Sequence, residues 1–69
     1  MIAVRVTSDG AIHWSQKGCK RSAIYQSEML TLVDDIGAGL TRQSAMPCPD
    51  AKTAQHKAEL WILEGSVDD

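Results

Sequence analysis

The side chains of this sequence that could bind a soft metal ion are two histidines and two cysteines, namely His13, Cys19, Cys48 and His56. Zinc sites in proteins are usually built from pairs of ligands that lie only a few residues apart. Here five residues separate His13 from Cys19, and seven separate Cys48 from His56. This spacing is not typical of a zinc site, so we expect no metal and no other cofactor.

Nucleophilic catalysis would need a cysteine or serine beside a base, with a third group that orients the base. His13 and Cys19 could supply two of these parts, but nothing in their spacing requires it. A chain of 69 residues also has little volume for a pocket. We therefore predict that the protein is not an enzyme and has no catalytic residue. Both cysteines are expected to be free thiols in a reducing compartment.

Positive charge is concentrated in the first part of the chain. Residues 1–26 carry four Lys or Arg against one Asp, a net charge of +3, whereas residues 27–69 carry three Lys or Arg against eight Asp or Glu, a net charge of −5. The basic segment 17–22 precedes a predicted helix and could hold a phosphate group. The candidate phosphate-binding residues are Arg5, His13, Lys17, Lys20 and Arg21. A domain that binds duplex nucleic acid usually has a pI above about 9, and the pI here is about 5.5, so nucleic acid is an alternative that we do not favour.

Two tryptophans are the largest apolar side chains, and tryptophan is enriched in binding hot spots. We predict that Trp14 lies in the core and that Trp61 lies at an interface, because residues 60–63 (LWIL) are apolar all round. A helix that is apolar on every side has more apolar surface than one small domain covers. The pair of acidic residues at 34–35 could add a charged rim. The predicted partner-binding residues are Asp34, Asp35, Leu60, Trp61 and Leu63.

The first element that must position these residues is a β-hairpin over about 2–16. A three-residue loop at Ser8-Asp9-Gly10 closes it, because Gly10 can adopt the left-handed conformation that ends such a loop. This register pairs Val6 with Ile12, Val4 with Trp14 and Arg5 with His13. A two-residue loop would exchange the faces and scatter the apolar side chains.

A helix is predicted over about 23–42. Its stripe of apolar residues has helical spacing and consists of Tyr25, Met29, Leu32, Val33, Ile36 and Leu40. The weak point is GAG at 37–39, since glycine disfavours helix interiors. Either the helix ends near Gly37, or Gly39 lets another backbone approach closely.

A proline-containing linker at 46–49 follows, because residues before proline favour extended conformations. A second helix is predicted over about 50–64, with Asp50 as its cap and Gly65 as its stop. The alternative is a short helix followed by a strand at 59–64 that pairs with the N-terminal strand. Residues 66–69 are expected to form a frayed tail.

The predicted fold is therefore a small single α+β domain over 1–69, a hairpin followed by two helices (ββαα). The core is short of bulk, because the chain has no Phe and eight of its hydrophobic residues are Ala. Chains of this size usually need a disulfide, a metal or a partner for stability, so we predict a homodimer. No apolar run is long enough to cross a bilayer, and we expect no membrane association and a cytoplasmic location.

These features favour a small non-enzymatic interaction protein that binds and occludes a protein partner, whose identity the sequence does not reveal. In general profile the chain resembles small accessory proteins of bacteriophages and mobile elements that inhibit host defence or regulatory proteins, and such a protein would act in the host cytoplasm. No motif carries this resemblance. The alternatives are a nucleic-acid or nucleotide binder that uses the basic hairpin end, and an assembly module within a larger complex.

Overall fold

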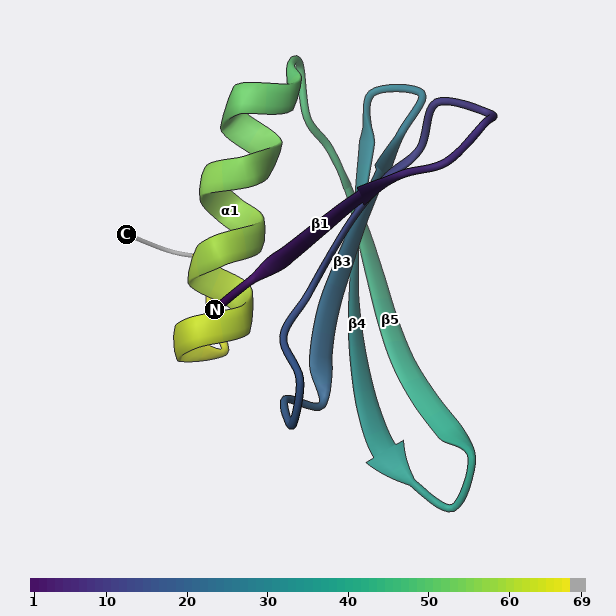
Figure 1. Cartoon of the computed structure of the whole chain (residues 1–69), viewed down its shortest axis with the longest axis vertical. Coiled ribbons are helices and arrows are strands. Elements are labelled where there is room, and N and C mark those ends of the chain that lie inside the picture. Colours follow the sequence, from purple (N-terminus) through teal and green to yellow (C-terminus); the bar gives the residue numbers. More distant parts are fainter. Residues whose placement is uncertain (68–69) are drawn as a thin grey trace.

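The computed structural model describes residues 1–67 and contains one antiparallel sheet and one helix (Figure 1). The strands pair in chain order, so that each is the neighbour of the next. The elements are β1 (Ala3–Val6), β2 (Ile12–Ser15), β3 (Arg21–Gln26), β4 (Met29–Gly37), β5 (Leu40–Pro47) and α1 (Ala51–Glu64). The predicted ββαα fold is therefore wrong, because the described residues form five strands and a single C-terminal helix.

The first hairpin has the predicted register. Val6 pairs with Ile12, and Val4 pairs with Trp14. The amide of Thr7 donates to the carbonyl of Ala11 over 2.9 Å and closes the loop at residues 8–10. Gly10 has a φ of 89°, the left-handed conformation that this loop requires.

The predicted helix over 23–42 is wrong, because β3, β4 and β5 occupy these residues. Leu30 and Leu32 alternate with Thr31 and Val33 along β4, and both leucines are buried. The apolar residues thus satisfy the two-residue period of a strand as well as a helical stripe. The turn between β3 and β4 consists of residues 27–28, which contain neither Gly nor Pro, so the sequence gives no ordinary turn signal there.

The GAG segment at 37–39 does not end a helix, and no other backbone lies close to the side-chain position of Gly37 or Gly39. They form the turn between β4 and β5, and residues 37, 38 and 39 all have positive φ. The predicted linker at 46–49 is also partly wrong, since β5 continues through Pro47. Proline is tolerated there because β5 is an edge strand of the sheet.

The C-terminal helix is confirmed, and the alternative strand at 59–64 is wrong. The side chain of Asp50 accepts a hydrogen bond from the amide of Thr53 over 2.8 Å, which caps the start of the helix. Gly65 ends it in the left-handed conformation, with its amide bonded to the carbonyl of Trp61 over 2.9 Å. In the predicted tail, Val67 packs against the core, while Asp68 and Asp69 lie outside the described residues.

The core lies between α1 and one face of the sheet. The helix packs on β2, β3 and β4, and its buried residues are Ala54, Ala58 and Ile62. The small alanine side chains let the helix lie close to the sheet. Trp14, which is only 2% exposed, fills much of the core between the helix and the sheet. Neither edge strand is covered, and all residues of β1 and nearly all of β5 are exposed. Within residues 1–67, α1 is not long and apolar enough to cross a membrane.

Candidate functional site

The strand pairing divides the side chains of the sheet into two sets. Trp14, Ala23, Leu32 and Ser44 lie in one row on the face that meets α1. The residues beside them in each strand point to the opposite face, which no helix covers (Figure 1). The candidate sites are a hollow on this outer face and a groove beside β5 on the helix face.

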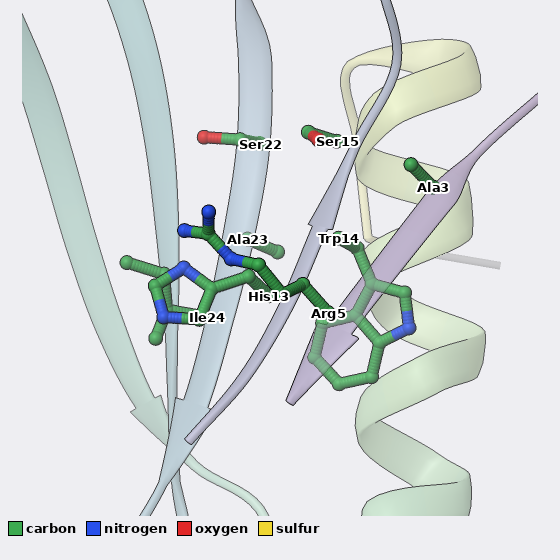
Figure 2. Close-up of a pocket in the computed structure, with 8 residues that line it drawn as sticks. All are labelled: Ala3, Arg5, His13, Trp14, Ser15, Ser22, Ala23 and Ile24. Carbon is green, nitrogen blue, oxygen red and sulfur yellow. The ribbon is translucent and has the colours of Figure 1, made fainter. Parts of the chain in front are cut away.

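The outer hollow is a depression of about 370 Å³ over β1, β2 and β3. Arg5 pairs with His13 across β1 and β2, and His13 pairs with Ile24 across β2 and β3. Figure 2 shows these three side chains on the same side of the sheet, with Ser22 on the same strand as Ile24 and the Trp14 ring directed away from them. The remaining lining residues are Ala3, Trp14, Ser15 and Ala23. Because the side chains of Trp14 and Ala23 are buried in the core, their main chain forms the floor.

The five candidate phosphate-binding residues are divided by the structure. Arg5 and His13 meet in the outer hollow, while Lys17 and Lys20 lie in the turn between β2 and β3. Arg21 points to the helix face, where its Nε donates to the carbonyl of Trp61 over 2.8 Å and its Nη2 to that of Ile62 over 3.0 Å. Arg21 thus binds the C-terminal end of α1. Ser22 and Ile24 were missed as lining residues because β3 was predicted to be helix.

The β5 groove has a volume of about 260 Å³ and lies between α1 and β5 on the helix face. It brings together Asp34 and Trp61, two of the predicted partner-binding residues. Trp61 is half-buried, its Nε1 donates to the carbonyl of Val33 over 3.2 Å, and the Arg21 guanidinium lies 6.0 Å from its ring centre. The other lining residues are Leu32, Arg42, Gln43, Ser44, Met46 and Val67.

The remaining predicted partner-binding residues lie outside this groove. By register Asp35 points to the outer face, and its Oδ1 accepts a hydrogen bond from the amide of Gly37 over 2.9 Å. Leu60 is half-buried on α1, and Leu63, 61% exposed, lies near its end. The predicted set is thus spread over both faces of the sheet and the helix.

The edge of β5 was not predicted from the sequence, because its helix-side residues do not form an apolar alternation. The amide of Cys48 donates to the carbonyl of Glu28. This bond shows which opposite residues of β4 and β5 are hydrogen-bonded pairs and which are not. Hydrogen-bonded pairs alternate in an antiparallel ladder. The main-chain groups of Thr41, Gln43 and Ala45 therefore point away from β4. The bond from the Thr7 amide to the Ala11 carbonyl gives the same alternation for β1 and β2. In β1 only the main-chain groups of Val4 and Val6 therefore point away from β2.

The four candidate metal ligands do not meet. Cys19 lies at the C-terminal end of α1, with its Sγ 3.5 Å from the carbonyl oxygen of Ile62, whereas Cys48 is buried just before the N-terminal end. Both are free thiols. His13 is in the outer hollow and His56 is exposed on α1. Within residues 1–67 no three His, Cys, Asp or Glu side chains are grouped where they could hold a metal ion.

Among the titratable groups whose pKa values are shifted by contacts of the fold are Asp9 and Tyr25. Hydrogen bonds from the side chains of Thr7 and Gln26 lower the pKa of Asp9, which thereby ties the first hairpin loop to β3. Desolvation raises the pKa of Tyr25, whose hydroxyl donates to the carbonyl of Cys48 over 2.9 Å. Neither group lies in the outer hollow or the β5 groove.

No protein-family model matches the chain, and neither a curated protein nor a solved structure is significantly similar to it.

Proposed function

We propose that this chain is a small non-enzymatic interaction protein that forms a homodimer through β5 and binds and occludes a protein partner. The observation that supports the proposal is the free edge of β5, eight residues long and exposed along nearly its whole length. An uncovered edge of this length is a template for another strand. The other edge strand, β1, has only four residues, and short edge strands are protected from pairing.

A second copy of the chain fits this edge in one antiparallel register better than in its neighbours. If Gln43 of one copy faces Gln43 of the other, Thr41 faces Ala45 on both sides, and all three outward amides of each copy are bonded. The next antiparallel register in one direction that still pairs the outward amides places Arg42 directly opposite Arg42 of the second copy. Like charges directly opposite each other are destabilising. Shifting in the other direction places Thr41 opposite Pro47, which has no amide to donate.

The same register covers apolar surface. Leu40, which is 61% exposed in one copy, would lie opposite Met46 of the second copy, at the β5 groove. The groove wall there is apolar, because Leu32, Met46 and Trp61 contribute to it. Dimerisation leaves the end of α1 accessible, and Leu63 is our candidate contact for the protein partner. The cytoplasm is the proposed compartment, since free thiols are usual there.

Dimerisation is tested by blocking the edge. Ala45→Pro removes an outward amide that the ladder between β4 and β5 does not use, so it should give a folded monomer of 7.5 kDa in light scattering. Val4→Pro is the matched control, because it removes an outward amide from the opposite edge, and it should stay dimeric like the parent. A parent protein that is monomeric at high micromolar concentration would contradict the proposal.

The register is tested by cross-linking in a Cys19→Ser background, where only the buried Cys48 remains. Directly opposite residues of a hydrogen-bonded pair have Cα atoms about 5.5 Å apart, which a disulfide can bridge. Gln43→Cys should therefore form a disulfide-linked dimer under mild oxidation. Ser44→Cys should not, and efficient cross-linking at Ser44 instead would show that the proposed register is wrong.

Partner binding is tested separately. The parent and Leu63→Asp, both shown to be folded and dimeric, are compared for the proteins that they retain from an extract of the source cells. The proposal predicts a protein that the parent retains and Leu63→Asp loses. Identical retention by the two would contradict the assignment of Leu63.

A further inference from the structure

We propose that the outer hollow binds a small phosphomonoester of the nucleotide type, through Arg5, His13, Ser15 and Ser22. The site is independent of the proposed dimer, because it lies over β1, β2 and β3 on the face opposite the β5 groove. Four different strand positions contribute its polar groups, and Ile24 contributes an apolar wall. Its volume of about 370 Å³ lies within the range of small-molecule pockets, roughly 300–1,000 Å³.

None of the residues that line the hollow is acidic. The carboxylates of this face lie beyond it, with Asp9 bonded to Gln26 and Asp35 on β4. By strand register the outer-face residues of β1, β2 and β3 are Ala3, Arg5, His13, Ser15, Ser22, Ile24 and Gln26, and they include no Asp or Glu. Within residues 1–67, Arg5 and His13 form no side-chain hydrogen bond or ion pair. An arginine and a histidine directly opposite each other repel when both are charged, and a bound anion would relieve that repulsion.

The number of donors favours phosphate over carboxylate. An arginine guanidinium offers a fork that matches two phosphate oxygens, and an imidazole and two hydroxyls add further donors. A carboxylate has only two oxygens, whereas a phosphomonoester has three that carry its charge. Lys17 and Lys20 lie in the turn that joins the ends of β2 and β3, next to Ser15 and Ser22. Lys20 lies opposite Asp35 of β4, whose amide donates to the Lys20 carbonyl over 2.9 Å, so the proposed phosphate contacts are those of Arg5, His13, Ser15 and Ser22 and not of this turn.

The apolar side of the hollow indicates what the phosphate is attached to. Ile24 lies next to the imidazole ring of His13 in the same row of the sheet, while Ala3 lies at the opposite corner of the hollow. A flat ring carried by the phosphate could pack against Ile24 and the imidazole. A nucleoside monophosphate has this combination of a ring and a terminal phosphate. A long nucleic acid is less suited, since the chain has a net charge of −2 and repels an extended polyanion outside this patch.

The test is an NMR titration of the parent protein with four probes: inorganic phosphate, adenosine monophosphate, adenosine and a single-stranded oligothymidylate. The proposal predicts that adenosine monophosphate shifts the amide signals of Arg5, His13 and Ser22 in a saturable way. Phosphate should shift the same signals at higher concentration, and adenosine should bind more weakly than its monophosphate. No saturable shift with either phosphate compound would overturn the proposal. Tighter binding of the oligothymidylate than of adenosine monophosphate at these residues would replace the small ligand by nucleic acid.

Arg5→Gln should weaken binding of adenosine monophosphate about tenfold or more, because charge-assisted hydrogen bonds are lost. Lys52→Gln is the control: it removes another exposed positive charge, on α1 and outside both the outer hollow and the β5 groove, and should bind like the parent. His13→Gln keeps a polar side chain without the imidazole and should bind more weakly than the parent. Equal weakening by Arg5→Gln and Lys52→Gln would show that only overall charge matters and would overturn the site. The amide spectra of the variants confirm that each is folded.

Discussion

Arg21 shows how one side chain joins two ends of this small fold. It comes from the start of β3, yet it donates to two main-chain carbonyls at the last turn of α1 and lies over the Trp61 ring. The Trp61 carbonyl also accepts the capping amide of Gly65, and a positive charge at this end of the helix is favourable. Arg21 was a candidate for binding phosphate in the alternative hypothesis, but its Nε and Nη2 donate to α1 here. A charge reversal at Arg21 would therefore report on folding before it reported on binding.

Replacing Arg21 with lysine should lower the free energy of unfolding by about 1–3 kcal/mol, because lysine cannot bond both carbonyls with a planar fork. Urea denaturation followed by tryptophan fluorescence measures the change. Arg5→Lys, on the exposed strand β1, is the control and should change it by less than about 0.5 kcal/mol. Equal losses in the two variants would show that the contacts of Arg21 contribute little.

Asp50 makes the start of α1 sensitive to acid. The hydrogen bond from the amide of Thr53 lowers the pKa of Asp50. A carboxyl group with a lowered pKa in the folded state contributes stability above its unfolded value, about 3.9. That contribution is lost as the pH falls through the folded pKa.

Asp50→Ala should lower the thermal midpoint at neutral pH by about 4–8 °C, and this difference from the parent should shrink between about pH 5 and pH 2. Thermal melts followed by circular dichroism measure both effects. Asp50→Asn keeps an acceptor for the Thr53 amide without the charge, so it should be less destabilised at neutral pH. A difference that is constant down to pH 2 would contradict the assigned role of the charge.

At the scale of the elements, the turn between β3 and β4 is the least suited to its residues. Ser27 and Glu28 have φ values of 52° and 61°. Two-residue hairpin loops with positive φ at both positions strongly prefer Asn-Gly. A non-glycine residue in the left-handed region is disfavoured by roughly 1–2 kcal/mol.

Ser27→Asn with Glu28→Gly should therefore raise the free energy of unfolding by about 1 kcal/mol. Urea denaturation measures the gain. Glu28→Ala removes the same charge but keeps a Cβ atom, so this control should give no comparable gain. A gain of equal size from Glu28→Ala would attribute the effect to charge instead of backbone conformation.

The same turn explains which elements the sequence could predict. The first hairpin and α1 were predicted correctly because Gly10, Asp50 and Gly65 mark their turns and ends locally. The middle of the chain was not, because Ser27 and Glu28 carry no turn signal and the apolar residues around them fit two periods. The contact of Arg21 with α1 could not be predicted either, since it joins positions forty residues apart and depends on the strands lying where they do.

At the scale of the whole molecule, the two proposed sites lie on opposite faces and at opposite edges of one sheet. The outer hollow involves β1, β2 and β3, and the dimer surface is the edge of β5. A dimer formed through β5 would hold ten strands in one sheet, with one outer hollow toward each end. The two sites can therefore be tested by separate variants without one test disturbing the other.

The order of the strands also determines how the chain can fold. Each strand pairs only with its neighbour in the sequence, so the sheet can grow by closing one short loop after another, at little entropic cost. Docking of α1 on β2 and β3 is the step that joins distant parts of the chain, and we expect it to come last. Ile62→Val, a buried position of α1, should then speed unfolding several-fold for a loss of about 1 kcal/mol. Its refolding rate in stopped-flow fluorescence should remain that of the parent, and slower refolding would place the helix in the folding nucleus.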